Sequence, residues 1–246
     1  MDERQKIEQL KEWLAESRHT VFLGGAGMST ESGIPDFRSA HGLYMQKKQG
    51  ISYEEMLSHD YFVRHTESFY DFLRHVMLYP DAKPNPAHRA LVRLEEKGGL
   101  EAVITQNIDG LHQKAGSRNV IELHGSAERY YCQSCGERFT MRDILECRGV
   151  PRCTRCGGTV RPDIVLYGEM LDERALGRAE YYVERADLLL VGGTSLVVYP
   201  VAGLVNETSP GAKLVILNRD TTPYDDRADL ILRGNLAEVL EAAAGG

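Results

Sequence analysis

The sequence predicts an α/β fold built on a doubly wound parallel sheet, and two patterns carry this prediction. Continuous apolar runs, typical of strands buried on both faces, occur at residues 20–23, 187–191 and 213–217. Stretches with apolar residues at helical spacing lie between them, beginning with residues 3–17. Regions 40–79 and 129–160 lack this alternation, so we expect them to form a smaller inserted domain, with a module of short helices in 40–79 and a cysteine-containing module in 129–160. The large domain would comprise residues 1–39, 80–128 and 161–246.

Strands and helices are expected to alternate along the large domain. After the first helix, strands are expected at 20–24, 101–105, 119–123, 187–191, 213–217 and 228–232. Helices are expected at 87–97, 172–186, 200–208 and 236–244, with a short one around Leu111 that ends near Gly116. Pro84-Asn85-Pro86 marks a helix start, and Gly98-Gly99 marks the end of that helix. The extended segment 164–167 leads back into the large domain.

Length and charge exclude several classes of protein. The chain has 246 residues, which suits one domain with an insert. Its formal net charge is −7, from 36 acidic and 29 basic residues, and this argues against nucleic acid as a direct ligand. No apolar run approaches the roughly 20 residues of a membrane span, so no membrane partner is expected. Residues Met1–Lys6 are charged and unlike a signal peptide, so we expect a cytoplasmic protein.

A glycine-rich turn after the first strand predicts a dinucleotide site. The glycines of Gly24-Gly25-Ala26-Gly27 let backbone N–H groups approach a phosphate. Ser29-Thr30-Glu31-Ser32 is interpreted as a helix start, whose free N–H groups favour an anion. This order of strand, turn and helix makes the predicted large domain Rossmann-like. Position 30 is Thr, so the full G-x-G-x-x-G fingerprint is absent and a tight turn without a ligand stays open.

Four motifs, in order, resemble the signature of the sirtuins, a family of NAD-dependent protein deacylases. They are Gly25-Ala26-Gly27-x-Ser29-x-x-Ser32-Gly33-Ile34-Pro35-Asp36-Phe37-Arg38, Gln106-Asn107-Ile108-Asp109, Leu123-His124-Gly125 and Gly193-Thr194-Ser195. The resemblance spans nearly the whole chain and implies a bacterial-type NAD-dependent protein deacetylase. Such an enzyme acts on an acetyl-lysine protein or peptide and transfers the acetyl group to ADP-ribose. It releases deacetylated lysine, O-acetyl-ADP-ribose and nicotinamide, which is both product and inhibitor.

The resemblance also implies roles for individual residues. His124 would be the general base, with Asn107 as a second catalytic residue. Cofactor contacts are implied for the glycine turn and for polar strand ends: Gly25, Ala26, Gly27, Thr30, Asp36, Phe37, Arg38, Gln106, Asn107, Ile108, Asp109, His124, Gly193, Thr194, Ser195, Asn218 and Leu236. The substrate peptide would add as a strand beside Val165, Leu166, Tyr167 and Val198. From the residues alone, a structural role for His124 and a helix cap at Asp109 stay open.

Four of the five cysteines predict a structural zinc site. Cys132-x-x-Cys135 and Cys153-x-x-Cys156 are separated by 17 residues, a spacing typical of zinc ligands. Four thiolates leave no open coordination position, so the metal would be structural rather than catalytic. In a reducing compartment this pattern indicates a metal site rather than disulfides. The fifth cysteine, Cys147, lies in a helix-like stretch and is expected to pack.

The acyl preference follows from one departure from a family pattern. Sirtuins that remove acidic acyl groups carry Tyr-x-x-Arg, and the matching stretch, counted back from Pro84-Asn85, is Tyr70-Asp71-Phe72-Leu73. Arg74 lies one residue late, about 100° around a helix, so a succinyl carboxylate would lack its bidentate partner. We therefore expect acetyl-lysine to be preferred over succinyl-lysine. Longer apolar acyl groups, mono-ADP-ribosyl transfer, an NAD-dependent oxidoreductase and a non-enzymatic zinc-binding module stay open as alternatives.

Overall fold

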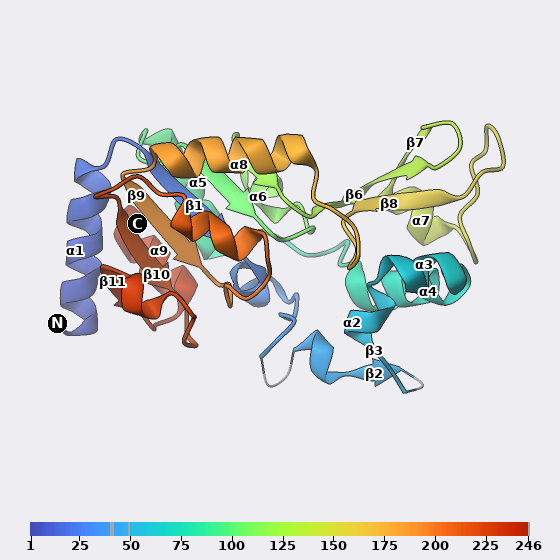
Figure 1. Cartoon of the computed structure of the whole chain (residues 1–246), viewed down its shortest axis with the longest axis horizontal. Helices are drawn as coiled ribbons and strands as arrows, with labels where there is room; N and C mark the ends of the chain where they lie inside the picture. The colour runs from blue at the N-terminus through green and yellow to red at the C-terminus, as the bar shows by residue number, and fades with distance from the viewer. Residues whose placement is uncertain (40–41, 49, 246) are drawn as a thin grey trace.

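The computed structural model describes residues 1–39, 42–48 and 50–245, so residues 40, 41 and 49 of the expected inserted segment lie outside it. Its centre is a six-stranded parallel sheet with the strand order β11-β10-β9-β1-β4-β5 (Figure 1). The strands are β1 (Thr20–Gly24), β4 (Ala102–Thr105), β5 (Val120–Glu122), β9 (Leu188–Gly192), β10 (Lys213–Leu217) and β11 (Leu230–Leu232). From β1 the chain builds the sheet first toward β5 and then toward β11. The predicted doubly wound parallel sheet is confirmed.

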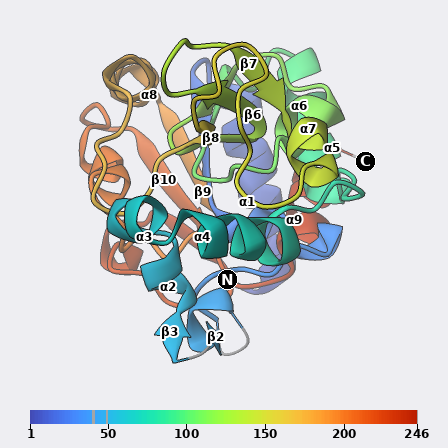
Figure 2. The same cartoon turned by 90° about the vertical axis from the view of Figure 1, so that its right-hand side faces the viewer.

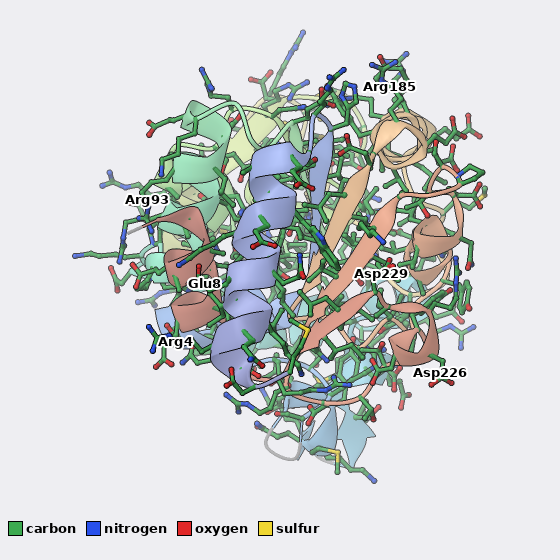
Figure 3. All side chains as sticks on the ribbon, turned by 90° about the vertical axis from the view of Figure 1, so that its left-hand side faces the viewer. Arg4, Glu8, Arg93, Arg185, Asp226 and Asp229 are labelled. Atoms are coloured by element: carbon green, nitrogen blue, oxygen red, sulfur yellow. The ribbon has the colours of Figure 1, made fainter. Side chains whose placement is uncertain are left out.

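Helices cover both faces of this sheet, which explains why its strands are apolar throughout. One face packs against α1 (Glu3–Glu16), α5 (Pro86–Glu96) and α9 (Leu236–Ala244). The other packs against α8 (Glu173–Arg185) and η5 (Val201–Asn206), whereas α6 (Leu111–Ala115) lies in the connection between β4 and β5. Figure 3 looks onto the first face, where α1 lies beside α9 and carries the exposed side chains of Arg4 and Glu8. No described helix has both the length and the apolar character needed to cross a bilayer.

Side-chain caps begin several of these helices where the sequence indicates a start. Asn85 accepts hydrogen bonds from the first free N–H groups of α5, and Pro86 occupies the first helical position. Asp2 forms a capping box with Gln5 at the start of α1. Asn235 caps α9 in the same way as Asn85 caps α5. These local signals explain why the helix boundaries agree with the sequence to within a few residues.

A smaller antiparallel sheet and a group of short helices extend from the main sheet (Figures 1 and 2). The small sheet has the order β7-β6-β8, with β6 (Gly125–Cys132), β7 (Arg138–Thr140) and β8 (Val160–Ile164), and α7 (Met141–Glu146) packs on it. The other segment contains the hairpin β2 (Lys47–Lys48) and β3 (Ile51–Ser52), α2 (Tyr53–Met56), α3 (His59–Arg64), α4 (Thr66–Phe72) and the π-helical η4 (Leu73–Met77). The two segments share one apolar core, although the boundaries of the two domains stay predictions.

Two helix predictions are wrong in detail. Residues 29–32 do not begin an α-helix, because the chain forms only the 3₁₀ turns η1 (Ala26–Met28) and η2 (Thr30–Ser32). Gly33 then adopts φ 82° and Pro35 follows, and both features stop a helix. The expected helix at 200–208 is the 3₁₀ helix η5. The 3₁₀ turn η3 (Leu43–Met45) lies in the region where short helices are expected, whereas η6 (Asp225–Arg227) is not expected from the sequence.

Candidate functional site

A cavity of about 1160 Å³ lies along the carboxyl ends of the parallel strands. Its walls come from the segments that follow β1, β4, β5, β9 and β10, together with the start of α9. In open α/β sheets ligands bind outside the carboxyl ends of the strands, where the strand order reverses, and here that point lies between β1 and β9. All of the residues expected to hold cofactor or peptide line this cavity. Their individual roles stay predictions.

The glycine turn packs directly against the loop that follows β9. A Cβ atom on Gly27 would lie 2.7 Å from the Cα of Gly193, and one on Gly25 would lie 2.7 Å from the Cβ of Thr194. Gly27 N also donates a hydrogen bond to Gly193 O at 2.8 Å. Glycine is therefore required here because two loops meet without space for a side chain. This contact fixes the turn at the edge of the cavity.

A polar network joins the glycine turn to the end of β4. Ser29 Oγ donates to Asp109 Oδ2 at 2.6 Å, and Asn107 Nδ2 donates to Ser29 Oγ at 3.1 Å. Asp109 Oδ1 accepts from Leu111 N at 2.8 Å, so the helix-cap role left open by the sequence is present beside the contact to the turn. Burial raises the pKa of Asp109, although the hydrogen bonds from Ser29 and Leu111 oppose this shift.

Ser29 and Asn85 are two site residues that the sequence-based list of contacts omits. Ser29 is buried and forms the centre of the network. It belongs to the motif that predicted the turn, but no role of its own was predicted for it. Asn85 lines the cavity, and its Nδ2 donates to Met28 O at 2.7 Å while its Oδ1 caps α5. The sequence indicated only the cap. The hydrogen bond from Asn85 to Met28 depends on how α5 packs against the turn, so the sequence around Asn85 does not indicate it.

Side chains at neighbouring strand ends also meet across the floor of the cavity. Gln106 Nε2, after β4, donates to Thr194 Oγ1, after β9, at 2.8 Å. Leu196 then adopts φ 52°, the single positive φ among described residues other than glycine, and is fully enclosed by the core. This strained position separates the expected cofactor segment 193–195 from the expected peptide segment around Val198.

His124 follows β5 and lines the cavity. Its Nδ1 donates to Gln106 O at 2.9 Å, which places the ring proton on Nδ1. Nε2 has no hydrogen-bond partner among the described residues, so this nitrogen is free to accept a proton. A purely structural role, which the sequence left open, would explain the hydrogen bond of Nδ1 but not the unpaired Nε2 that borders the cavity. The geometry therefore favours a general base.

The pH dependence of the reaction should reflect the burial of this ring. Burial lowers the pKa of His124 below its ordinary 6.5, and the hydrogen bond to Gln106 O opposes that shift only in part. A base must be unprotonated to act, so a lowered pKa keeps it active to a more acidic pH. We expect kcat/KM to stay level down to about pH 6.5 and to fall only below it. A pH profile measured from 5 to 8 tests this, and a fall centred above about 6.5 would contradict it.

The segment 165–167 has almost all of its backbone groups paired. Val165 N donates to His124 O at 3.1 Å, and Tyr167 N donates to Leu57 O at 3.0 Å. Leu166 N donates to Glu169 Oε2 at 2.9 Å, while Leu166 O accepts from Glu169 N. Val165 O, by contrast, has no hydrogen-bond partner among the described residues. An open carbonyl beside a cavity is what an added peptide strand requires.

A partly buried ion pair, not expected from the sequence, holds this segment in place. Glu169 accepts two hydrogen bonds from Arg161, at 2.9 and 3.0 Å, and one from His59 Nδ1 at 2.8 Å. Burial opposes the charge on Glu169, but the bonds from Arg161, Leu166 N and His59 outweigh it and lower the pKa of Glu169 to about 2. The carboxylate therefore stays charged and keeps its bond to Leu166 at every physiological pH.

Part of the cavity wall is apolar. It includes Leu43, Leu57, Met77, Met141 and Ile164, which also belong to the apolar core shared by the small sheet and the short helices. Tyr70, Leu73 and Arg74 do not line the cavity. The Tyr70 hydroxyl instead donates to Val160 O inside the small-sheet core, and the Arg74 guanidinium is committed to the carbonyls of Ile144 and Gly149, at 2.9 and 2.6 Å.

The four predicted zinc ligands come together at the far end of the small sheet. All Sγ atoms of Cys132, Cys135, Cys153 and Cys156 lie within 4.8 Å of one another, with Cys135 and Cys153 at 3.7 Å and Cys132 and Cys156 at 3.4 Å. A zinc tetrahedron with bonds of about 2.3 Å has edges of about 3.8 Å, so the donor set fits zinc. The predicted four-cysteine cluster is confirmed.

Comparisons with known proteins agree with this geometry. The chain matches the family model described as "Sir2 family" over residues 25–200. It is 52% identical over 237 residues to an NAD-dependent protein deacetylase of Clostridium perfringens, covering 96% of this chain and 97% of the relative. It is 53% identical over 236 residues to one of Cutibacterium acnes, with 96% of each covered.

Solved structures with the same fold contain the ligands that the cavity suggests. A structure of Sir2 with a p53 peptide and NAD+ matches with a TM-score of 0.86 and 46% identity, covering 96% of this chain and 95% of that one. A structure of Sir2Tm bound to a propionylated peptide matches with a TM-score of 0.86 and 46% identity, covering 96% of each chain.

Proposed function

This chain belongs to the Sir2 family, and we propose on that basis that it is an NAD-dependent protein lysine deacetylase. It transfers the acetyl group of acetyl-lysine to ADP-ribose and releases nicotinamide and the free lysine. One observation carries the proposal: the open Nε2 of His124, the network around Ser29 and the open carbonyl of Val165 border one cavity at the strand-order reversal. Curated relatives in Clostridium and Cutibacterium carry the same activity in their names.

Different residues at the sheet edge would bind the cofactor and transfer the proton. When bound, NAD supplies the ribose carbon to which the acetyl oxygen bonds as nicotinamide leaves. The glycine turn and Thr194 would hold its phosphates, and Asn107 and Asp109 would orient the nicotinamide end. His124 Nε2 would then accept the proton of a ribose hydroxyl, while the Gln106 carbonyl holds Nδ1 and thereby the orientation of the ring.

The peptide would bind as a strand between the segment 165–167 and the turn at Val198, which precedes η5. Val165 O would accept the backbone N–H of acetyl-lysine, and Val198 would lie on the opposite side. The acyl chain would then point toward the apolar part of the cavity wall. We also propose a cytoplasmic location, because four zinc-binding thiolates require a reducing compartment.

The apolar part of the cavity wall predicts which acyl groups the enzyme prefers. A succinyl carboxylate placed among Leu43, Met77 and Ile164 would be buried without a cation, because Arg74 is committed elsewhere. We expect kcat/KM for a succinyl-lysine peptide to be about a hundredfold lower than for the same peptide acetylated. A butyryl peptide of the same chain length is the control and should retain activity. Equal kcat/KM for the succinyl and acetyl peptides would contradict this prediction.

A single assay separates the proposed function from its alternatives. The chain is incubated with NAD and an acetyl-lysine peptide, with and without added nicotinamide. Deacetylated peptide and O-acetyl-ADP-ribose should appear only with NAD, and nicotinamide should inhibit. Radiolabel from NAD retained on protein would instead indicate a mono-ADP-ribosyltransferase. Absorbance of reduced nicotinamide would indicate an oxidoreductase.

A further inference from the structure

The loop that carries Phe37 and Arg38 folds into a compact unit, which we call the cofactor loop (residues 36–39 and 42–45). Leu43 N donates to Asp36 O and Tyr44 N donates to Phe37 O, both at 2.9 Å. The rings of Phe37 and Tyr44 are 5.1 Å apart at their centroids. The two expected cofactor contacts and Tyr44 therefore belong to one packed unit.

One hydroxyl group joins the cofactor loop to a distant part of the chain. Tyr44 Oη lies 2.7 Å from Tyr167 Oη, and Arg38 Nη2 donates to the same Tyr167 oxygen at 3.3 Å. The Arg38 guanidinium also lies 5.1 Å from the centroid of the Tyr44 ring. Among the described residues, these are the hydrogen bonds that tie the cofactor loop to segments far away in the sequence.

Tyr167 belongs to the segment proposed to hold the peptide. Its backbone is fixed by Leu57 O and by His59 N, and it lies two residues after the open carbonyl of Val165. Tyr167 is 36% exposed, so its phenol is not needed to fill the core. The hydroxyl thus lies between the part of the site that would meet NAD and the part that would meet the peptide.

The hydrogen-bonding capacity of the three groups makes this contact specific. Arg38 can only donate, so the Tyr167 oxygen accepts from it, and the two tyrosine hydroxyls share the remaining bond. Burial and then the neighbouring Tyr167 raise the pKa of Tyr44 above its ordinary value, so its phenol stays protonated at neutral pH. A phenylalanine at position 167 would keep the ring and remove both hydrogen bonds.

We propose that the Tyr167 hydroxyl couples the two substrates by fastening the cofactor loop to the peptide-binding segment, so that either ligand raises the affinity for the other. The first ligand orders the shared contact, and the second then binds to a site that is already ordered. This inference rests on the proposed function. It adds a positioning residue that acts on affinity rather than on the chemical step.

Titration calorimetry with ADP-ribose, which cannot react with the peptide, tests the coupling. The dissociation constant of an acetyl-lysine peptide is measured with and without saturating ADP-ribose. ADP-ribose should tighten peptide binding to the unmodified chain by about three- to tenfold, the value of one neutral hydrogen bond. In Tyr167→Phe this factor should fall to within about twofold of one.

Three further variants decide whether the hydroxyl pair is responsible. Tyr44→Phe should lose only part of the coupling, because the bond from Arg38 to the Tyr167 oxygen remains. The double variant should lose no more than Tyr167→Phe alone, because that change already removes both bonds. Tyr181→Phe, an exposed tyrosine on α8, is the matched control and should retain the coupling. Full coupling in Tyr167→Phe, or none in the unmodified chain, would overturn the proposal. An unmodified chain that binds neither ligand would overturn the proposed function as well.

Discussion

Replacing His124 with alanine is expected to lower kcat/KM for an acetyl-lysine peptide by at least about a hundredfold while leaving NAD binding in place. The reason is geometric. Nε2 of His124 is the open basic nitrogen at the cavity wall, and Nδ1 only orients the ring through Gln106 O. The backbone bond from Val165 N to His124 O survives the substitution, so the peptide segment should keep its place.

Calorimetry with NAD and steady-state kinetics with the peptide measure the two halves of this prediction. His75→Ala is the matched control, because His75 is an exposed histidine whose ring contacts Asp71. It should change neither quantity. Turnover that survives His124→Ala would indicate a different base, whereas an unmodified chain without turnover would support the non-enzymatic zinc-binding alternative. Loss of NAD binding together with turnover would indicate a structural role for the histidine.

The position of the site could be predicted because two kinds of local information agree. Apolar runs such as Leu188–Val191 identify strands that are buried on both faces. In a parallel sheet the polar residues that follow such strands meet at one edge, so Gln106, His124 and Thr194 were expected to lie together. The cysteine spacing was equally informative, because each pair needs only one tight turn to place two thiolates.

Contacts between distant segments could not be predicted in the same way. The bond from His59 to Glu169 and the Tyr44–Tyr167 contact both join the inserted segment 40–79 to the segment that follows β8, more than a hundred residues away. Their sequences show only single charged or aromatic residues, which occur on any surface. The 3₁₀ turns at residues 26–32 also escaped prediction, because the packing of Gly27 against Gly193 overrides local helix propensity there.

Loss of a zinc ligand is expected to be the most damaging change to stability. Each cysteine pair closes a tight turn: Gly136 N donates to Cys132 O at 2.9 Å, and Gly157 N donates to Cys153 O at 2.8 Å. Gly136 and Gly157 both adopt φ 73°, which glycine alone adopts without strain. These turns hold the sulfur atoms close together. Without a metal, the four metal–sulfur bonds are lost. The sulfur atoms would then either repel one another as thiolates or be crowded together as thiols without a bonding partner.

Cys153→Ser should therefore lower the free energy of unfolding by several kcal/mol, on the order of 5, and reduce bound zinc from about one per chain to near zero. Elemental analysis and denaturant unfolding measure the two effects. Cys147→Ser is the matched control, because Cys147 lies outside the cluster. This variant should keep its bound zinc. An unmodified chain purified without zinc, or a Cys153→Ser variant of unchanged stability, would contradict the assignment.

Loss of zinc should also affect the binding of the two substrates unequally. This difference separates a local effect from general unfolding. Cys132 pairs with Val160 at the start of β8, and β8 ends at Ile164, directly before the proposed peptide segment. Cys132 and Cys153 are buried in the same apolar core as Ile164 and Leu166. The glycine turn, by contrast, is anchored on the large sheet and packs against Gly193. Chelation of zinc at low denaturant should therefore weaken peptide binding before it weakens NAD binding, and parallel loss of both would indicate that the two regions unfold as one.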